Sequence, residues 1–307
     1  MIISASRRTD IPALYAQWFV NRLKEGYFLV PNPRNSTRIG RVDVSPDNVD
    51  CIVFWTKNPL PILDKLDEIK ELGYSFYFHF TFNPYQETIE NNLPTKKELY
   101  ESFITLSNKI GSNFLIWRYD PIFIDEKHSI EWHIKNFEYM CSKLHRYTKR
   151  CMISFIDPYK NIKKNYREMT IDEIKILMES FSKIAKKYEI SLYTCAEEID
   201  LTDYNILKGA CIDKDIVENL LQCGINAKKD VNQRKECNCL EAVDIGAYDT
   251  CLNGCSYCYA ISSNKLLQKN INNHDVNAPM LTGYPRGDEI ITNRTKESYK
   301  DKQLKLF

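Results

Sequence analysis

The sequence lacks several features that identify common classes of protein. No apolar run approaches the roughly 18 residues that a membrane-spanning helix needs. The opening residues, MIISASRRTD, contain no hydrophobic region of a secretory signal. The net charge is only +1 and no basic stripe is present, which argues against binding to nucleic acid. We therefore expect a cytoplasmic protein that acts on neither membranes nor nucleic acid.

Signature motifs of several enzyme classes are also missing. The chain has no nucleophile elbow, no P-loop and no GxGxxG element, so hydrolase and nucleotide-binding folds lack support. Its 307 residues are enough for one large core or two smaller domains.

Cysteine, by contrast, is abundant, with 11 residues in the chain. In a reducing compartment such usage indicates metal or redox chemistry rather than disulfides. The odd number also fits a complete disulfide framework poorly. Five cysteines lie within 22 residues, which core packing alone would not favour: Cys237, Cys239, Cys251, Cys255 and Cys258.

Short apolar segments alternate with helical patterns over the first two-thirds of the chain. We expect strands over residues 2–6, 51–56, 76–82, 114–119, 150–156 and 191–195. Between them, Thr95 with Glu98 and Thr170 with Glu173 are typical of capping boxes that begin helices. Six strand–helix units predict an α/β fold with a parallel sheet, closed into a complete or partial TIM-like (β/α) barrel.

The domain organisation follows from a change in composition near residue 208. We expect barrel units over 1–207, a cysteine-rich segment over 208–262 and an irregular tail over 263–307. AVDIG (242–246) could be one more short strand. If it pairs beside IISAS (2–6), the cysteine loop that follows it lies at the barrel mouth.

The tightest cysteine group stands in CLNGCSYCYA, residues 251–260. A loop this short can present Cys251, Cys255 and Cys258 to one iron–sulfur cluster, and Gly254 eases the turn. Such clusters usually take four thiolates, so a distant cysteine completes the site or one iron stays open to a small molecule. A structural zinc site is the alternative, and it also needs a fourth ligand.

Four further cysteines could form a second metal site. Cys195, Cys211, Cys237 and Cys239 together offer enough thiolates for a zinc ion or a second iron–sulfur cluster. The alternative is that Cys195 and Cys211 are small buried side chains of the core.

Charged residues follow most of the expected strands, and in a barrel these ends meet at one mouth, where barrel enzymes place their sites. The basic residues could hold the carboxylate or phosphate of an anionic small-molecule substrate, and the acidic ones an amino group or a ribose. Surface salt bridges and helix caps are the alternative, for Asp10 in particular. The predicted catalytic residues are Arg7, Arg8, Asp10, Lys57, Arg118, Asp120 and Glu197, and Asn58 and Asp157 are predicted to bind a cofactor.

The C-x3-C-x2-C spacing, with Tyr257 before the third cysteine, resembles the signature of the radical SAM enzymes. The resemblance implies a [4Fe-4S] cluster on Cys251, Cys255 and Cys258, with S-adenosylmethionine on the fourth iron and Tyr257 beside its adenine. It further implies cleavage to a 5′-deoxyadenosyl radical, acting on an unknown polar or anionic substrate, and an electron donor such as a reductase, flavodoxin or ferredoxin.

Two departures from those enzymes are visible. Their cluster loop follows the first strand, so the late position here looks like a circular permutation. Their Gly-Gly-Glu element, which meets the amino group of S-adenosylmethionine, is absent, since the chain contains no Gly-Gly dipeptide.

The chain also resembles, over nearly its whole length, a mainly bacterial family of unknown function with a radical-SAM-like cysteine cluster at its carboxyl end. The matching stretches are SASRRTDIP (4–12), FWTKNP (54–59), WRYDP (117–121), TCAEEIDL (194–201), GACID (209–213) and the segment 237–260. The family supplies no activity. Two other functions therefore stay open: a non-SAM iron–sulfur redox protein and a zinc-stabilised nucleic-acid-binding module.

Overall fold

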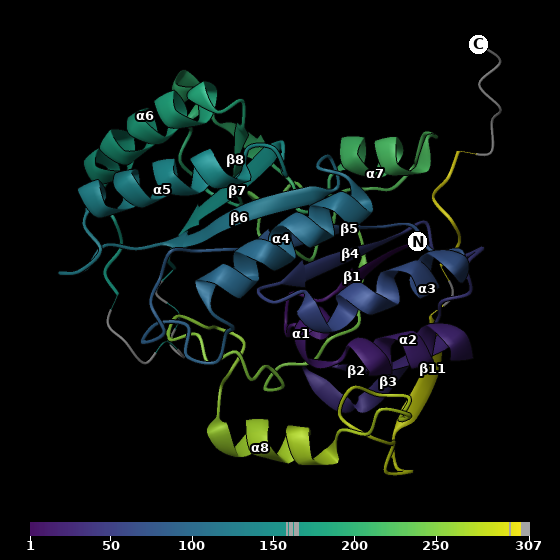
Figure 1. Ribbon diagram of the computed structural model, residues 1–307. Helices are drawn as coiled ribbons and strands as arrows, with labels where there is room; N and C mark the ends of the chain where they lie inside the picture. The colour runs from purple at the N-terminus through teal and green to yellow at the C-terminus, as the bar shows by residue number, and fades with distance from the viewer. Residues whose placement is uncertain (158, 160–161, 163–165, 295, 302–307) are drawn as a thin grey trace.

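A sheet of eight parallel strands lies at the centre of the computed structural model, which describes residues 1–157, 159, 162, 166–294 and 296–301 (Figure 1). The order across the sheet is β10-β1-β4-β5-β6-β7-β8-β9. All six strands expected from the sequence are present. The strands are β1 Ile2–Ala5, β4 Cys51–Thr56, β5 Phe76–Thr81, β6 Leu115–Ile122, β7 Arg150–Phe155, β8 Ser191–Cys195, β9 Leu207–Gly209 and β10 Val243–Asp244.

The late strand β10 joins the sheet beside β1, as the pattern of AVDIG suggested. Ile3 pairs with Val243 and Ser4 pairs with Asp244. The edge strands β9 and β10 are three and two residues long, and within the described residues they are not paired with each other. The expected α/β parallel sheet is thus confirmed, while its hydrogen bonding leaves it open rather than closed into a barrel.

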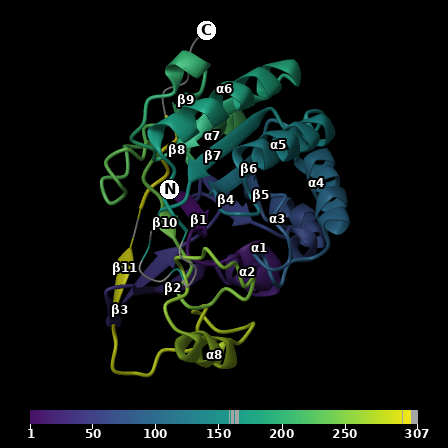
Figure 2. The ribbon, with the colours of Figure 1, turned by 90° about the vertical axis from the view of Figure 1, so that its left-hand side faces the viewer.

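Helices cover one face of this sheet, and Figure 2 shows α3, α4 and α5 on the same side of the strands. Alternate strand residues, among them Phe54, Phe78 and Trp117, form the large core beneath them with Phe137 and Phe181. Both predicted capping boxes are confirmed, at the starts of α4 and α6. The elements here are α1 Ile11–Leu14, α2 Ala16–Glu25, η1 Leu60–Lys65, α3 Leu66–Glu71, α4 Lys96–Ile110, α5 Ile130–Leu144 and α6 Ile171–Lys187.

The cysteine-rich segment covers the opposite face. Strand residues of the other parity, such as Val53, Tyr77 and Ile116, form a second core with residues of this segment. Helix α7 (Lys214–Leu221) contributes Ile216 and Val217, and the cysteines at 211, 237 and 239 belong to the same cluster. This packing places three of the four candidate ligands of the second site against the sheet.

The expected irregular tail over 263–307 needs correction, because it contains α8 (Asn264–Asn273) and β11 (Ile290–Arg294). Strand β11 pairs with the hairpin of β2 (Tyr27–Asn32) and β3 (Asn35–Asp43) in a small second sheet. Neither α8 nor β11 fully buries any residue, and the polar composition of the tail led us to expect no regular element there. Residues 295 and 302–307 of that tail lie outside the described part.

The short 3-10 helix η2 (Thr202–Tyr204) completes the named elements. A search of the described residues finds no helix of the length and apolar character needed to cross a membrane.

Candidate functional site

A cleft of about 1160 Å³ opens at the carboxyl ends of the parallel strands, marked by Arg7 after β1, Lys57 after β4 and Glu197 after β8. It brings together every predicted site residue except Asn58. The side-chain oxygen of Asn58 instead accepts a hydrogen bond from the backbone N–H of Leu60, at the start of η1. The predicted residues that line the cleft are Arg7, Arg8, Asp10, Lys57, Arg118, Asp120, Asp157, Glu197, Tyr257, Cys195, Cys211, Cys237, Cys239, Cys251, Cys255 and Cys258.

The loop that carries Cys251, Cys255 and Cys258, here called the cluster loop, is fixed on one side by residues 89–92. The side chain of Asn92 donates to the carbonyl of Leu252 over 2.7 Å, and the N–H of Ser256 donates to the carbonyl of Ile89 over 2.9 Å. Gly254 has a φ of +69°, and a Cβ there would lie 3.0 Å from the Asn92 side chain. The positive φ therefore favours glycine, and the close approach of Asn92 leaves little room for a side chain at this position.

Asp10 fixes the other side of the cluster loop. Its carboxylate accepts hydrogen bonds from the Asn253 side chain (2.9 Å), the N–H of Lys57 (2.7 Å) and the N–H of Ala13 (3.1 Å). Burial raises the pKa of Asp10, while these hydrogen bonds oppose the shift. Asp10 thus joins α1, the end of β4 and the cluster loop, which is a positioning role.

The three cysteines of the cluster loop are half-buried and line the cleft. Burial raises the pKa of Cys251 to about 12, and it also raises the pKa values of Cys255 and Cys258. The N–H of Ala260 donates to Cys258 Sγ over 3.4 Å, a contact common at sulfur ligands of clusters. As the side chains stand, no group of three or more His, Cys, Asp and Glu within the described residues could hold a metal ion.

Three thiols on one short loop that lines a cleft are nevertheless the donor set that an iron–sulfur cluster with one open iron takes. The residues present therefore fit such a cluster chemically.

A buried ion-pair network lies beside the cluster loop. Lys57 Nζ donates to Glu90 Oε1 over 2.9 Å and to the Tyr257 hydroxyl over 2.7 Å, and that hydroxyl donates to Glu90 over 2.5 Å. Lys96 Nζ donates to the other oxygen of Glu90 over 2.8 Å. Burial acts to raise the pKa of Glu90, but Lys57 and Lys96 outweigh it and lower the pKa to about 2.

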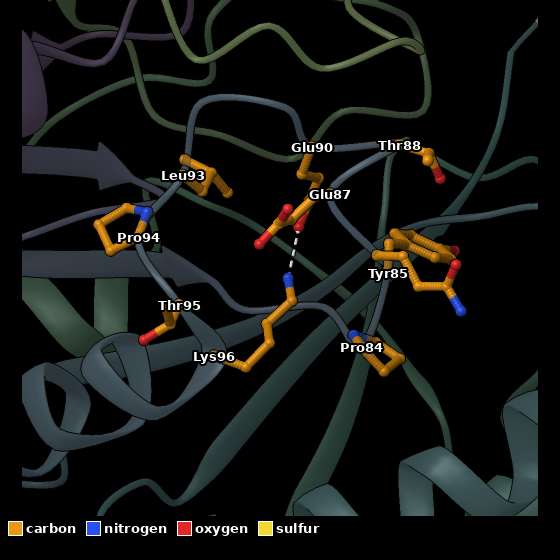
Figure 3. Close-up of a pocket in the computed structure, with 10 residues that line it drawn as sticks. Pro84, Tyr85, Glu87, Thr88, Glu90, Leu93, Pro94, Thr95 and Lys96 are labelled. Carbon is orange, nitrogen blue, oxygen red and sulfur yellow. Dashed lines mark hydrogen bonds and ion pairs between the residues drawn. The ribbon is translucent and has the colours of Figure 1, made fainter.

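Figure 3 shows Lys96 reaching Glu90 from an adjoining pocket of about 470 Å³. Glu90 and Lys96 line this pocket, whereas Lys57 and Tyr257, the partners of the other Glu90 oxygen, line the cleft. Sequence reasoning missed Glu90, because it lies in the loop between β5 and α4 and belongs to no recognisable spacing or motif.

The four cysteines of the second predicted site contact one another. Cys195 Sγ and Cys211 Sγ are 3.2 Å apart, and Cys211, Cys237 and Cys239 belong to one buried cluster of side chains. Hydrogen bonds from Cys195 and Cys239 lower the pKa of Cys211 well below its usual value, helped by the charge of Arg118. The structure thus assembles this predicted group, from the end of β8, the loop after β9 and the segment before β10.

Two arginines adjoin these sulfurs. Arg118 Nη1 donates to Cys211 Sγ over 2.9 Å, and its Nε and Nη2 donate to Asp120 over 3.1 and 2.8 Å. The guanidinium of Arg7 lies 5.1 Å over the ring of Trp55, and its buried Nη2 has no hydrogen-bond partner among the described residues. Burial acts to lower the pKa of Arg7, but the charges of Cys239 and Cys211 outweigh it and raise the pKa.

The remaining predicted residues lie around the cleft. Glu197 accepts a hydrogen bond from the N–H of Phe155 over 2.9 Å, and burial raises its pKa to about 7. Asp157 pairs with Arg234 over 2.6 Å at the exposed rim. Arg8 Nη1 reaches the carbonyl of Gly246 over 3.4 Å.

Fold and site together define a parallel α/β protein in which two groups of cysteines share a charged cleft. A family described as "Domain of unknown function (DUF1848)" matches residues 2–260, and the chain belongs to this family. No curated protein sequence matches the chain. One similar solved structure is a Bacteroides thetaiotaomicron protein provisionally described as an alpha-L-fucosidase, with 13% identity and a TM-score of 0.25 over 57% of this chain and 72% of that chain. A similarity this weak supports no inference about the fold or the function of this chain.

Proposed function

We propose that the protein is a radical-SAM-like iron–sulfur enzyme in which Cys251, Cys255 and Cys258 hold a [4Fe-4S] cluster. One observation carries the proposal: the three cysteines, at the spacing of that superfamily, line the same cleft as the charged residues that end the parallel strands. The carboxyl edge of a parallel sheet is the usual place for such a site.

We also infer that the sheet is a partial TIM-like barrel, circularly permuted relative to radical SAM enzymes. The cluster loop follows β10, and β10 lies beside β1. The loops after these two strands meet, because the Ser6 hydroxyl donates to Asp244 over 2.6 Å and the Tyr259 hydroxyl donates to the carbonyl of Arg7 over 2.7 Å. A cluster loop late in the sequence therefore occupies the neighbourhood of the first strand.

When bound, the cluster would supply the electron that cleaves S-adenosylmethionine held at its open iron. The chain's own residues hold the surrounding groups in place. Lys57 and Glu90 fix the hydroxyl of Tyr257, so the ring stays at the wall of the cleft.

Other side chains would take the place of the absent Gly-Gly-Glu element. Asp10 and Arg118 already have strong partners within the protein. Arg8, whose guanidinium makes a long contact to the carbonyl of Gly246 and lies 5.4 Å from the centre of the Tyr248 ring, has no carboxylate partner among the described residues and is the residue we assign to an anionic group of the cofactor or substrate. Glu197, a carboxyl group that lines the cleft and accepts a hydrogen bond from the N–H of Phe155, is the residue we assign to proton transfer.

The test is anaerobic reconstitution followed by reduction. Iron bound at the cluster loop should amount to about four per chain, and dithionite with S-adenosylmethionine should release 5′-deoxyadenosine. Cys258→Ala should abolish the release, whereas Cys223→Ala, a half-buried cysteine outside both groups, should leave it unchanged.

Three other outcomes would contradict the proposal. If the fully reconstituted protein releases no 5′-deoxyadenosine under a range of reductants, the proposed cleavage of S-adenosylmethionine is refuted. An EPR spectrum that S-adenosylmethionine leaves unaltered would indicate a non-SAM iron–sulfur redox protein. Stoichiometric zinc, with no iron after anaerobic purification from iron-replete cells, would indicate the zinc-stabilised module.

A further inference from the structure

A second group of cysteines faces the same cleft as the cluster loop. This four-cysteine group consists of Cys195, Cys211, Cys237 and Cys239, all of which line the cleft. Cys211, Cys237 and Cys239 are almost completely buried against the face of the sheet that the cysteine-rich segment covers. The hydroxyl of Tyr77 donates to the carbonyl of Cys211 over 2.7 Å, which fixes the backbone at that ligand position.

We propose that the four-cysteine group holds a second iron–sulfur cluster, and that Arg7 and Arg118 compensate its negative charge. Four thiolates on a [4Fe-4S] core leave a net charge of about −2, which two guanidinium groups match. The choice of iron–sulfur over zinc rests on the proposed function, because only a redox-active centre could pass electrons to chemistry in the same cleft.

The four-cysteine group lies beside two buried arginine side chains, which is unusual for cysteines that only fill an apolar core. A buried guanidinium is costly unless anionic groups or hydrogen-bond acceptors surround it. Arg118 has one carboxylate partner, Asp120, and turns its remaining Nη1 toward Cys211 Sγ at 2.9 Å. Arg7 buries an Nη2 that has no hydrogen-bond partner within the described ranges. Anionic sulfur ligands would meet the charge of both arginines.

Hydrogen bonds to sulfur also follow the pattern of a cluster site. The N–H of Ile212 donates to Cys239 Sγ over 3.4 Å, and Arg118 donates to Cys211 Sγ. Such contacts stabilise thiolate ligands and tune the reduction potential of a cluster.

A simple disulfide does not account for the group. The sulfurs of Cys195 and Cys211 are 3.2 Å apart, well beyond the bonded distance of about 2.05 Å. Cys237 and Cys239 belong to the same buried cluster of side chains as Cys211, and Cys195 packs against that cluster, so four thiols rather than two are assembled. A bound cluster requires the sulfurs to separate by side-chain rotation, since no group of His, Cys, Asp and Glu in the described residues could hold a metal ion as it stands.

The experiment separates the two sites by their iron content. The variant Cys251→Ala/Cys255→Ala/Cys258→Ala lacks the ligands of the first cluster, so after anaerobic purification it should retain about four irons and four sulfides per chain. Wild type should carry about eight, and Cys211→Ala/Cys237→Ala about four. Cys223→Ser is the control and should match wild type.

Spectroscopy of the triple variant adds a measure that needs no activity. Its reduced form should give an EPR signal that S-adenosylmethionine leaves unchanged. In that background Arg118→Gln should lower the midpoint potential, because a positive charge and a hydrogen bond to sulfur are lost. The iron content and EPR signal of the triple variant test for the second cluster even if the Cys211→Ala/Cys237→Ala variant fails to fold.

A folded triple variant without iron would overturn the proposal, and stoichiometric zinc in it would overturn the iron–sulfur assignment. If the triple variant keeps its iron while wild type releases no 5′-deoxyadenosine, the second cluster stands and the proposed function fails. If the triple variant has no iron but wild type cleaves S-adenosylmethionine, the proposed function stands and the second cluster is refuted.

Discussion

Replacing Glu90 with glutamine should destabilise the protein strongly, although the change removes no volume. The Glu90 side chain is 2% exposed, and its carboxylate meets Lys57, Lys96 and the hydroxyl of Tyr257. Glutamine keeps the shape but leaves Lys57, whose side chain is 15% exposed, without an anionic partner. Breaking a buried pair in this way costs about 3–5 kcal/mol of the free energy of unfolding.

The pKa of Glu90 leads to a similar magnitude. It falls from 4.5 to about 2 on folding. At 1.36 kcal/mol per pKa unit, this corresponds to a stabilisation of about 3 kcal/mol by the ionised carboxylate. Because the folded pKa is lowered, that stabilisation is complete above pH 4.5 and is lost as the pH falls toward 2.

Urea unfolding of wild type and four variants tests this reasoning. At pH 7, E90Q should lose about 3 kcal/mol or more, and K57M should lose more than K96M, because Lys96 is 39% exposed and its pair is screened by solvent. The double variant E90Q/K57M should cost less than the sum of the single changes, since it leaves no unpaired buried charge.

The pH dependence provides an internal control. The difference between wild type and E90Q should shrink as the pH is lowered from 5 to 3, with acid effects common to both proteins cancelling. A loss below 1 kcal/mol for E90Q at pH 7, together with equal losses for K57M and K96M, would refute the buried-pair argument.

Four further substitutions test local features. Thr95→Ala and Thr170→Ala should each lower stability by about 1 kcal/mol in urea unfolding, because each removes a capping box. Gly254→Ala should cost about 1–2 kcal/mol and reduce iron at the cluster loop, whereas Gly287→Ala, with positive φ but no crowding, should leave iron unchanged. Phe137→Ala, which removes a ring 3.8 Å from that of Phe181, should cost about 3–5 kcal/mol.

The sequence predicted the parallel sheet well because its strands are apolar on both faces. The runs at 51–56 and 191–195 match β4 and β8 to the residue. The gathering of strand-end residues such as Arg7 and Glu197 in one cleft then follows from topology, since the carboxyl ends of parallel strands share an edge.

Other features depend on contacts that no local pattern encodes. Whether the sheet closes is decided by its short edge strands β9 and β10, which carry little periodicity. Glu90 reaches the site from a loop, and Asn58 turns away to a backbone N–H although it also ends a strand. Chemical type and position at a strand end can place a residue near the cleft, but its partners depend on tertiary packing.

The pairing of β1 with β10 also sets an order of assembly. Ser4 and Asp244, joined by a hydrogen bond of 2.9 Å, are 240 residues apart. During synthesis the free edge of β1 therefore waits for nearly the whole sheet, and contacts at such a separation form slowly. Cys237, Cys239 and the cluster loop emerge from the ribosome at the same late stage. The proposed clusters could therefore form only after the other seven strands of the large sheet have been synthesised, and a chain truncated before residue 237 would contain those strands without most of the proposed ligands.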